Sequence, residues 1–181
     1  MAELSLNKKR ILLTSLSGQL GGLEFRLHDE ANLLTKFGYI VEIAINPFPG
    51  IDDLIKSLKK DRVKFSFFSP PPFFEQWRWR RVNKIRAFLR YSRFFKKSKF
   101  DLVHVAFAWT STGVERLWLA HKANIPSVIS VHNAFPYNEF SPWHERILYE
   151  SFKSVRGVYA VSDTALDCFL KSYKKFIVPG T

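Results

Sequence analysis

The sequence predicts an α/β fold with a doubly wound, mostly parallel β-sheet covered by helices on both faces, a three-layer α/β/α sandwich. Short apolar runs with little polar alternation are typical of strands that are buried on both faces. These runs alternate along the chain with stretches in which apolar residues recur at helical spacing. The chain has 181 residues, of which 46% are hydrophobic, so it can build one sizeable core. We therefore expect residues 1–181 to form a single domain that binds its ligand beyond the carboxyl ends of the strands.

The expected elements follow from these patterns and from the residues that interrupt them. Gly38 ends the first helical pattern, the run Pro70-Pro71-Pro72 breaks regular structure, and Ser162 can cap the last helix. Strands are expected at 11–16, 40–45, 63–68, 102–107, 127–131, 158–161 and 176–178. Helices are expected at 23–37, 51–60, 74–97, 113–123 and 142–154, and after Ser162.

Charge is concentrated in one part of the chain. The formal net charge is +12, and ten basic residues but no acidic ones lie between Arg78 and Lys99. The other 18 basic residues nearly balance the 16 acidic ones, so the excess charge is a local feature of that segment.

The cysteine content and the apolar runs of the sequence indicate the cellular compartment in which the protein is expected. Cys168 is the only cysteine, which excludes an internal disulfide, and its apolar neighbours favour a buried helix position over a reactive thiol. Lys8-Lys9-Arg10 precedes an apolar run that is too short for a signal peptide, and no stretch is long enough to span a bilayer. We therefore expect a cytoplasmic protein.

Three loops follow strands and should meet at the ligand-binding edge of the sheet. The first contains Gly21 and Gly22, which either let backbone N–H groups approach an anion or only form a tight turn. The second contains Trp109 and Thr110. The third begins with His132, which can exchange hydrogen bonds or a proton with a ligand, or can merely cap local backbone.

The other histidines and motifs point to no further chemistry. His104 lies inside a strand and is expected to be a hydrogen-bonded core residue or a support for a neighbouring ligand-binding group. His28, His121 and His144 lack metal-ligand spacing and are expected on the surface or in packing. The sequence has no GxGxxG, P-loop or GxSxG motif, and no metal site is expected.

Five short motifs occur in an order and spacing that the fold class alone does not require. They are Gly21-Gly22-Leu23-Glu24, Phe100–His104, Ile125–Asn133, Tyr159–Ser162 and Val178–Gly180. In this order they resemble the N-terminal domain of the family-4 glycosyltransferases, which have the GT-B architecture. The resemblance covers almost the whole chain.

This resemblance implies a retaining transfer of a sugar from a nucleotide-sugar to a glycan or lipid-linked acceptor, with no cofactor besides that co-substrate. It implies a Rossmann-like, acceptor-binding domain that faces a donor-binding domain across a cleft. The family roles fall on Gly21 and Gly22 at the donor diphosphate and on His132 near the transferred sugar. The further candidates are Glu24 and Asn133 at the diphosphate or the cleft, and Trp109 and Thr110 on the acceptor side.

The sequence departs from the family pattern at two places. Tyr39 stands where the family commonly has histidine, and Val178-Pro179-Gly180-Thr181 lacks the usual asparagine. The donor-binding domain, with its paired glutamates, is expected to be absent from this chain, which should be inactive without such a domain or subunit. Two alternatives stay open: a non-catalytic Rossmann-like binding or scaffold domain, and half of a GT-B nucleotide-sugar epimerase.

The basic segment between Arg78 and Lys99 is a candidate surface for docking on a membrane that carries the acceptor. Its expected apolar face consists of Val82, Ile85, Phe88 and Leu89. A separate basic stripe consists of Arg86, Arg90, Arg93 and Lys97, and the aromatic residues expected outside the core face are Trp77, Trp79, Tyr91 and Phe94. This pattern favours peripheral docking on an anionic membrane, at its inner face. An ordinary solvated helix face is the alternative, and nucleic acid is not expected as a partner because no known binding module is present.

Overall fold

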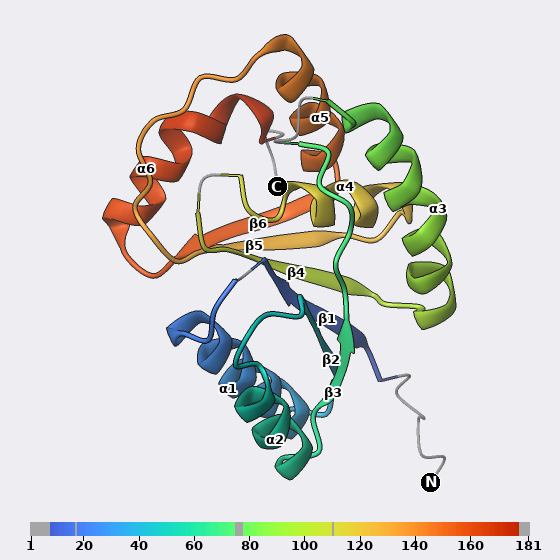
Figure 1. Ribbon diagram of the computed structural model, residues 1–181. Coiled ribbons are helices and arrows are strands. Elements are labelled where there is room, and N and C mark those ends of the chain that lie inside the picture. Colours follow the sequence, from blue (N-terminus) through green and yellow to red (C-terminus); the bar gives the residue numbers. More distant parts are fainter. Residues whose placement is uncertain (1–7, 17, 75–77, 110, 178–181) are drawn as a thin grey trace, which may run out of the picture.

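The computed structural model describes residues 8–16, 18–74, 78–109 and 111–177. Within this part of the chain, six parallel strands form one sheet in the order β3-β2-β1-β4-β5-β6 (Figure 1). The strands are β1 (Arg10–Ser15), β2 (Ile40–Ile45), β3 (Lys64–Phe67), β4 (Leu102–Phe107), β5 (Ser127–Val131) and β6 (Val155–Ala160). The helices are α1 (Gly22–Lys36), α2 (Asp52–Lys60), α3 (Arg80–Ser98), α4 (Val114–Lys122), α5 (Pro142–Phe152), α6 (Asp163–Tyr173) and the 3-10 helix η1 (Lys174–Phe176).

The helices cover both faces of the sheet, which confirms the predicted doubly wound α/β class. Figure 1 shows α1 and α2 on one face and α3, α4, α5 and α6 on the other. Each face has its own apolar core: Leu27 and Leu54 belong to the first, and Phe95, Leu117 and Phe169 to the second. The strand order reverses between β1 and β4, and this switch point is where doubly wound sheets bind ligands.

Most element boundaries lie close to the predicted ones, but the chain end differs. A strand was predicted at 176–178. At Phe176 this prediction is wrong, because Phe176 belongs to η1, which continues directly from α6. Phe176 is 3% exposed and packs against the rings of Tyr149 and Phe152, so burial of its ring is achieved without strand pairing. Val178 and the rest of that motif lie outside the described residues. Ser162 does cap α6, because its Oγ accepts a hydrogen bond from the Ala165 N–H at 3.2 Å.

Helix α3 is rotated relative to the prediction, and it begins later. Its buried positions are Asn83, Ala87, Tyr91 and Phe95. The predicted apolar face is therefore wrong: Ile85 and Leu89 are 59% and 64% exposed, and Val82 and Phe88 are exposed as well. Tyr91 and Phe94 were expected outside the core face, but Tyr91 is buried and Phe94 packs against the core. Trp79 is exposed, and Trp77 lies outside the described residues.

The segment beneath α3 explains this rotation. The Tyr91 hydroxyl donates to the Ser69 carbonyl at 2.7 Å, and the Asn83 amide donates to the Pro72 carbonyl at 2.7 Å. A proline-rich segment cannot satisfy its carbonyls within regular structure, so α3 turns its polar and aromatic residues toward that segment. The apolar side chains on the other side of α3 are consequently left facing outward.

A buried pair of charged residues on α4 holds the same region together. Glu115 Oε1 accepts hydrogen bonds from the N–H groups of Phe73 and Phe74, at 3.2 and 3.0 Å, which keeps this segment out of the predicted start of α3. Arg116 is 1% exposed and donates to Thr14 Oγ1 at 3.0 Å, to Asn46 Oδ1 at 2.7 Å and to the Phe68 carbonyl at 3.2 Å. Arg116 thereby ties together the carboxyl ends of β1, β2 and β3.

Candidate functional site

A pocket of about 380 Å³ lies at the switch point of the sheet, at the carboxyl ends of β1, β4 and β5. Its lining residues are Gln19, Gly21, Gly22, Leu23, Glu24, Ala108, His132 and Asn133. The structure thus brings together five of the residues that the sequence singled out, from loops more than a hundred residues apart. A ligand in this pocket would contact the glycine loop on one side and His132 on the other.

The glycine loop leads directly into α1. Gly21 is extended (φ −159°), and α1 begins at Gly22. Neither glycine has a positive φ, in contrast to Gly113 (φ +111°), and a Cβ at Gly22 would meet no heavy atom within 4 Å. Neither backbone conformation nor packing therefore requires glycine at position 22. The missing side chain instead leaves space in front of the first-turn N–H groups, which an α-helix does not satisfy itself.

Glu24 supports this loop from inside the protein. Its Oε2 accepts a hydrogen bond from the Gly21 N–H at 3.0 Å, and the side chain is 3% exposed. An ionised carboxylate in this position would repel a diphosphate that touched it. The geometry therefore makes Glu24 a support of the loop, and leaves the N–H groups of Gly22 and Leu23 as the groups suited to bind an anion.

His132 and Asn133 occupy the loop after β5. The Asn133 amide donates to the Ala108 carbonyl at 2.7 Å and so joins the loops that follow β4 and β5. His132 Nε2 lies 2.8 Å from Ser130 Oγ. Burial, together with the nearby Arg26 and His104, lowers the pKa of His132 to about 4. At neutral pH the side chain is therefore an uncharged imidazole that can exchange hydrogen bonds with a ligand.

The residues behind His132 were not all predicted. His104 is buried as expected, but it also contacts Glu30 on α1, Ser130 on β5 and Tyr159 on β6. His132 directly follows β5 and stands two residues after Ser130, a spacing that could have indicated that both side chains lie on the same side of the chain. Nothing in the sequence pairs Glu30 with His104, because their contact depends on how α1 packs on the sheet.

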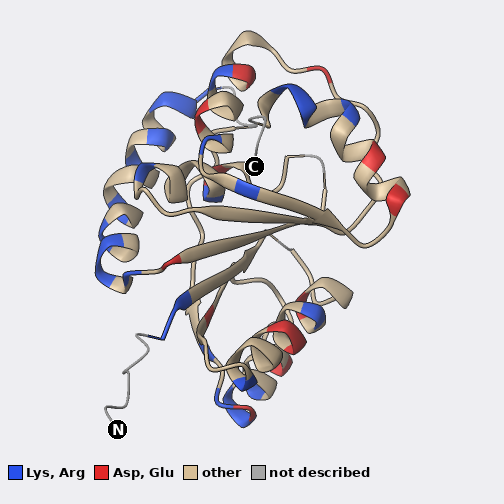
Figure 2. Ribbon diagram, turned by 180° about the vertical axis from the view of Figure 1, so that it is seen from behind, with Lys and Arg blue, Asp and Glu red and all other residues tan. Residues whose placement is uncertain are grey.

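Trp109 and the predicted basic residues do not line this pocket. Trp109 is exposed, with its ring edge toward Phe135 at a centroid distance of 6.2 Å, and it does not line the pocket. Thr110 lies outside the described residues. The predicted basic stripe is exposed along α3, where Figure 2 shows Lys and Arg positions gathered on the ribbon. Its members are Arg86, Arg90, Arg93 and Lys97.

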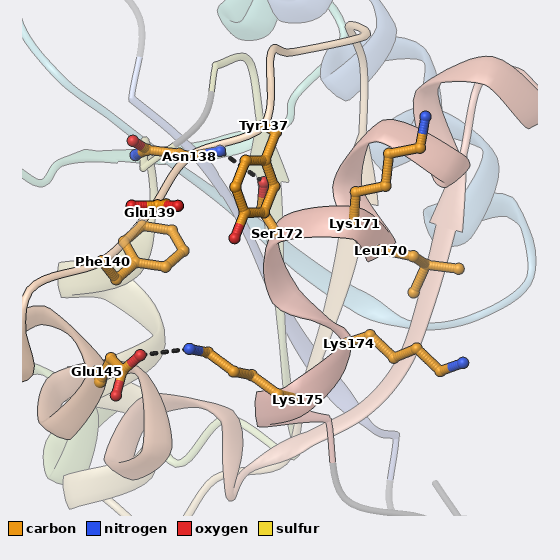
Figure 3. A pocket seen from close by; sticks show the side chains of 10 residues that line it. All are labelled: Tyr137, Asn138, Glu139, Phe140, Glu145, Leu170, Lys171, Ser172, Lys174 and Lys175. Carbon is orange, nitrogen blue, oxygen red and sulfur yellow. Dashed lines mark hydrogen bonds and ion pairs between the residues drawn. The ribbon is translucent and has the colours of Figure 1, made fainter.

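A larger hollow, of about 680 Å³, lies between the 137–140 segment and α6 (Figure 3). Lys175 forms an ion pair with Glu145 there, and the Asn138 N–H donates to Ser172 Oγ at 3.1 Å. Figure 3 shows the amino groups of Lys171 and Lys174 directed away from the hollow. It contains none of the predicted site residues, so the smaller pocket at the switch point remains the candidate site.

The described residues contain neither a cluster of metal ligands nor a membrane-spanning helix. No three or more His, Cys, Asp or Glu side chains among the described residues are grouped so that they could hold a metal ion. In the same part of the chain, no helix combines the length and apolar character needed to cross a membrane.

The strand order and the pocket at the switch point place the chain in the class of Rossmann-like α/β domains. The model of Glycosyltransferase Family 4 matches residues 20–177. The chain therefore belongs to this family and is a GT-B-type domain corresponding to the N-terminal half of that architecture. Among curated proteins, no sequence matches it significantly.

Solved structures of low sequence identity share the fold. A glycosyltransferase from Rickettsia africae is 22% identical, with a TM-score of 0.67 over 95% of this chain. HepE from Anabaena, in complex with UDP, is 16% identical, with a TM-score of 0.55 over 94% of this chain. UDP-GlcNAc 2-epimerase from Neisseria meningitidis, bound to UDP-GlcNAc, is 15% identical, with a TM-score of 0.59 over 89%. The chain spans 42%, 43% and 42% of these three proteins, respectively.

Proposed function

We propose that this chain is the acceptor-binding half of a retaining glycosyltransferase, which transfers a sugar from a nucleotide-sugar to a glycan or lipid-linked acceptor. One observation carries the proposal: the first turn of α1 and the neutral His132 face a common pocket at the switch point of the sheet. Membership of Glycosyltransferase Family 4 supports transfer over the epimerase alternative, although the chain shares its fold with an epimerase.

The two sides of the pocket suit different parts of a nucleotide-sugar. The N–H groups of Gly22 and Leu23 and the positive end of the α1 dipole stabilise the negative charge that develops on a leaving diphosphate. Glu24 holds the loop in place through the Gly21 N–H. His132 faces the sugar, to which an uncharged imidazole can offer a hydrogen bond without adding a charge.

This pocket is only one wall of the proposed active site. The chain spans about two fifths of the length of these solved structures, of which HepE contains UDP and the Neisseria epimerase contains UDP-GlcNAc. In the proposal a second, donor-binding domain or subunit covers the pocket and holds most of the nucleotide-sugar. The chain by itself is then inactive and binds the sugar donor weakly.

Titration of the 181-residue chain with nucleotide-sugars tests this division of roles. UDP-glucose, UDP-N-acetylglucosamine and GDP-mannose are each expected to bind with a Kd weaker than about 1 mM in calorimetry, because half of the contacts are missing. Micromolar binding of any of them by the chain alone would overturn the assignment of donor binding to another domain.

The outward face of α3 supports the proposal that the chain docks on a membrane, where it would bind a lipid-linked acceptor. Exposed Ile85 and Leu89 form an apolar strip, and Arg86, Arg90 and Arg93 lie directly beside it on the same helix. The strip continues into a groove of about 340 Å³ at Trp118 of α4, over whose ring Lys84 Nζ lies at 4.8 Å. Exposed apolar side chains flanked by cations fit an anionic lipid surface.

Sedimentation with phosphatidylglycerol vesicles tests the membrane proposal. The chain should co-sediment at low salt, and replacing Arg86, Arg90 and Arg93 with glutamate should lower the partition coefficient at least about 100-fold, at about 1 kcal/mol per cation. Ile85→Gln with Leu89→Gln should also lower it, without changing charge.

A control variant changes the net charge equally on another part of the surface. Replacing Lys36, Lys59 and Lys60 at the exposed ends of α1 and α2 with glutamate should leave most of the binding intact. Equal losses in both triple variants would mean that net charge alone drives retention. No retention of the unchanged chain at low salt would refute docking.

A further inference from the structure

A series of polar side chains connects His132 with helix α1 through the interior of the protein. Glu30 Oε1 lies 2.9 Å from His104 Nδ1, His104 Nε2 lies 2.7 Å from Ser130 Oγ, and Ser130 Oγ lies 2.8 Å from His132 Nε2. Ser130 and His104 are 0% and 2% exposed. Water therefore has little access to the middle of this series.

The single proton of the Ser130 hydroxyl couples the two imidazoles. A hydroxyl donates one hydrogen bond and accepts others. Ser130 Oγ lies between the two Nε2 atoms, so its hydroxyl can donate to one of them and accept from the other. In that arrangement one of the two nitrogens carries a proton, and the direction of one hydrogen bond determines the direction of the next.

The surroundings of His104 select one direction. The Glu30 carboxylate favours a proton on His104 Nδ1, since a lone pair there would face a negative oxygen. The Tyr159 hydroxyl lies 3.1 Å from His104 Nε2, so two hydroxyl groups face this nitrogen and suit it as an acceptor. The opposite direction would put the proton of the neutral His104 ring on Nε2 and leave the Nδ1 lone pair facing the Glu30 carboxylate.

We propose that Glu30, His104 and Ser130 are positioning residues that hold His132 with its proton on Nε2 and present the lone pair of Nδ1 to the pocket. With this arrangement, Ser130 donates to His104 and accepts from His132. Nδ1 is then the ring nitrogen that Ser130 does not engage. On the proposed function, on which this last step rests, Nδ1 accepts a hydrogen bond from a hydroxyl of the transferred sugar.

The low proton affinity of His132 keeps this arrangement intact at neutral pH. Protonation of Nδ1 would remove the lone pair, but burial and the neighbouring Arg26 and His104 lower the pKa of His132 to about 4. The Tyr159 phenol, for its part, stays protonated because burial and the charge of Glu30 raise its pKa. The groups that face the two imidazoles from α1 and β6 thus favour the same state.

Nitrogen-15 NMR of histidine side chains in the 181-residue chain tests the proposal without any ligand. At pH 7, His104 should carry its proton on Nδ1, the less common form of a free imidazole, and His132 should carry its proton on Nε2. A proton on Nδ1 of His132, or on Nε2 of His104, would overturn it.

Variants of two buried serines on β5 separate positioning from packing. Ser130→Ala should expose the His132 Nε2–H to fast exchange with water and broaden its proton signal beyond detection, and Ser130→Thr should restore it. Ser127→Ala is the matched control, because Ser127 Oγ contacts Ser154 and neither imidazole. A His132 signal that is unchanged in Ser130→Ala would overturn the proposal.

Kinetics of the transferase that contains the chain test the sugar contact separately. Ser130→Ala should lower kcat about 10-fold with little change in KM for the sugar donor, and Ser130→Thr should recover most of it. If the tautomers are as proposed but kcat is unchanged, the sugar contact is wrong. If no transfer is found in the unaltered protein, the proposed function fails while the NMR result stands.

Discussion

Replacing Arg116 with methionine is expected to lower the free energy of unfolding by about 3–5 kcal/mol, a large part of the stability of a single domain. Because methionine fills a volume similar to that of arginine, packing is largely kept. The lost free energy of unfolding therefore reports mainly on the polar contacts of Arg116. Without the guanidinium, Asn46 Oδ1 and the Phe68 carbonyl lose their hydrogen-bond donor, and the Glu115 carboxylate loses the adjacent positive charge. Burial lowers the pKa of Arg116 only to about 10, so the side chain is charged at neutral pH.

Urea denaturation followed by circular dichroism measures this loss. Arg81→Met on the exposed face of α3 is the matched control and should change the free energy by less than about 0.5 kcal/mol. Arg116→Lys should fall between the two, because lysine keeps the charge but cannot reach three acceptors with a planar group. A loss below about 1 kcal/mol for Arg116→Met would show that the three strand ends do not depend on this side chain.

The sheet was predictable because its strands are buried on both faces. In β1 and β4 nearly every side chain is buried, which requires the continuous apolar runs that the sequence displays at 11–13 and 105–107. The alternation of these runs with helical periodicity left few other topologies. The handedness of parallel crossovers then decides on which face of the sheet each connecting helix lies.

The rotation of α3 could not be predicted from periodicity. Two stripes on this helix are suited to a core, and the more apolar one, which contains Ile85 and Leu89, is exposed. The stripe with Asn83 and Tyr91 is buried instead, because carbonyls of the proline-rich segment need hydrogen-bond donors. The partner segment directly precedes the helix, but its need for hydrogen-bond donors is not visible in the spacing of apolar residues within the helix.

The pocket was predictable in part. Gly21, Gly22 and His132 stand in loops after strands, and parallel strands bring such loops to one edge. The support of Gly21 by Glu24 follows a spacing known from helix capping, in which an acidic residue near the helix start bonds back to the loop. The contact of Glu30 with His104 required the structure, since it joins a helix surface to a buried strand.

Replacing His132 with alanine should have the largest effect on glycosyl transfer. The imidazole is held from behind by Ser130 and lines the pocket opposite the first turn of α1. A preorganised hydrogen bond to the transferred sugar in a water-poor site contributes most in the transition state, and its loss typically costs about 10²–10³-fold in kcat. The fold should tolerate the change, because His132 lies at the end of β5 in a half-buried position.

The rate of sugar transfer that we propose for the protein containing this chain, compared between His132→Ala and the unaltered protein, tests the central claim most directly. The expected result is a fall in kcat of at least about 100-fold, with an unchanged unfolding transition. His121→Ala serves as the control, since His121 lies on α4 and does not line the pocket, and it should transfer at the normal rate. Normal turnover by His132→Ala would contradict the claim that this pocket is one wall of the transfer site.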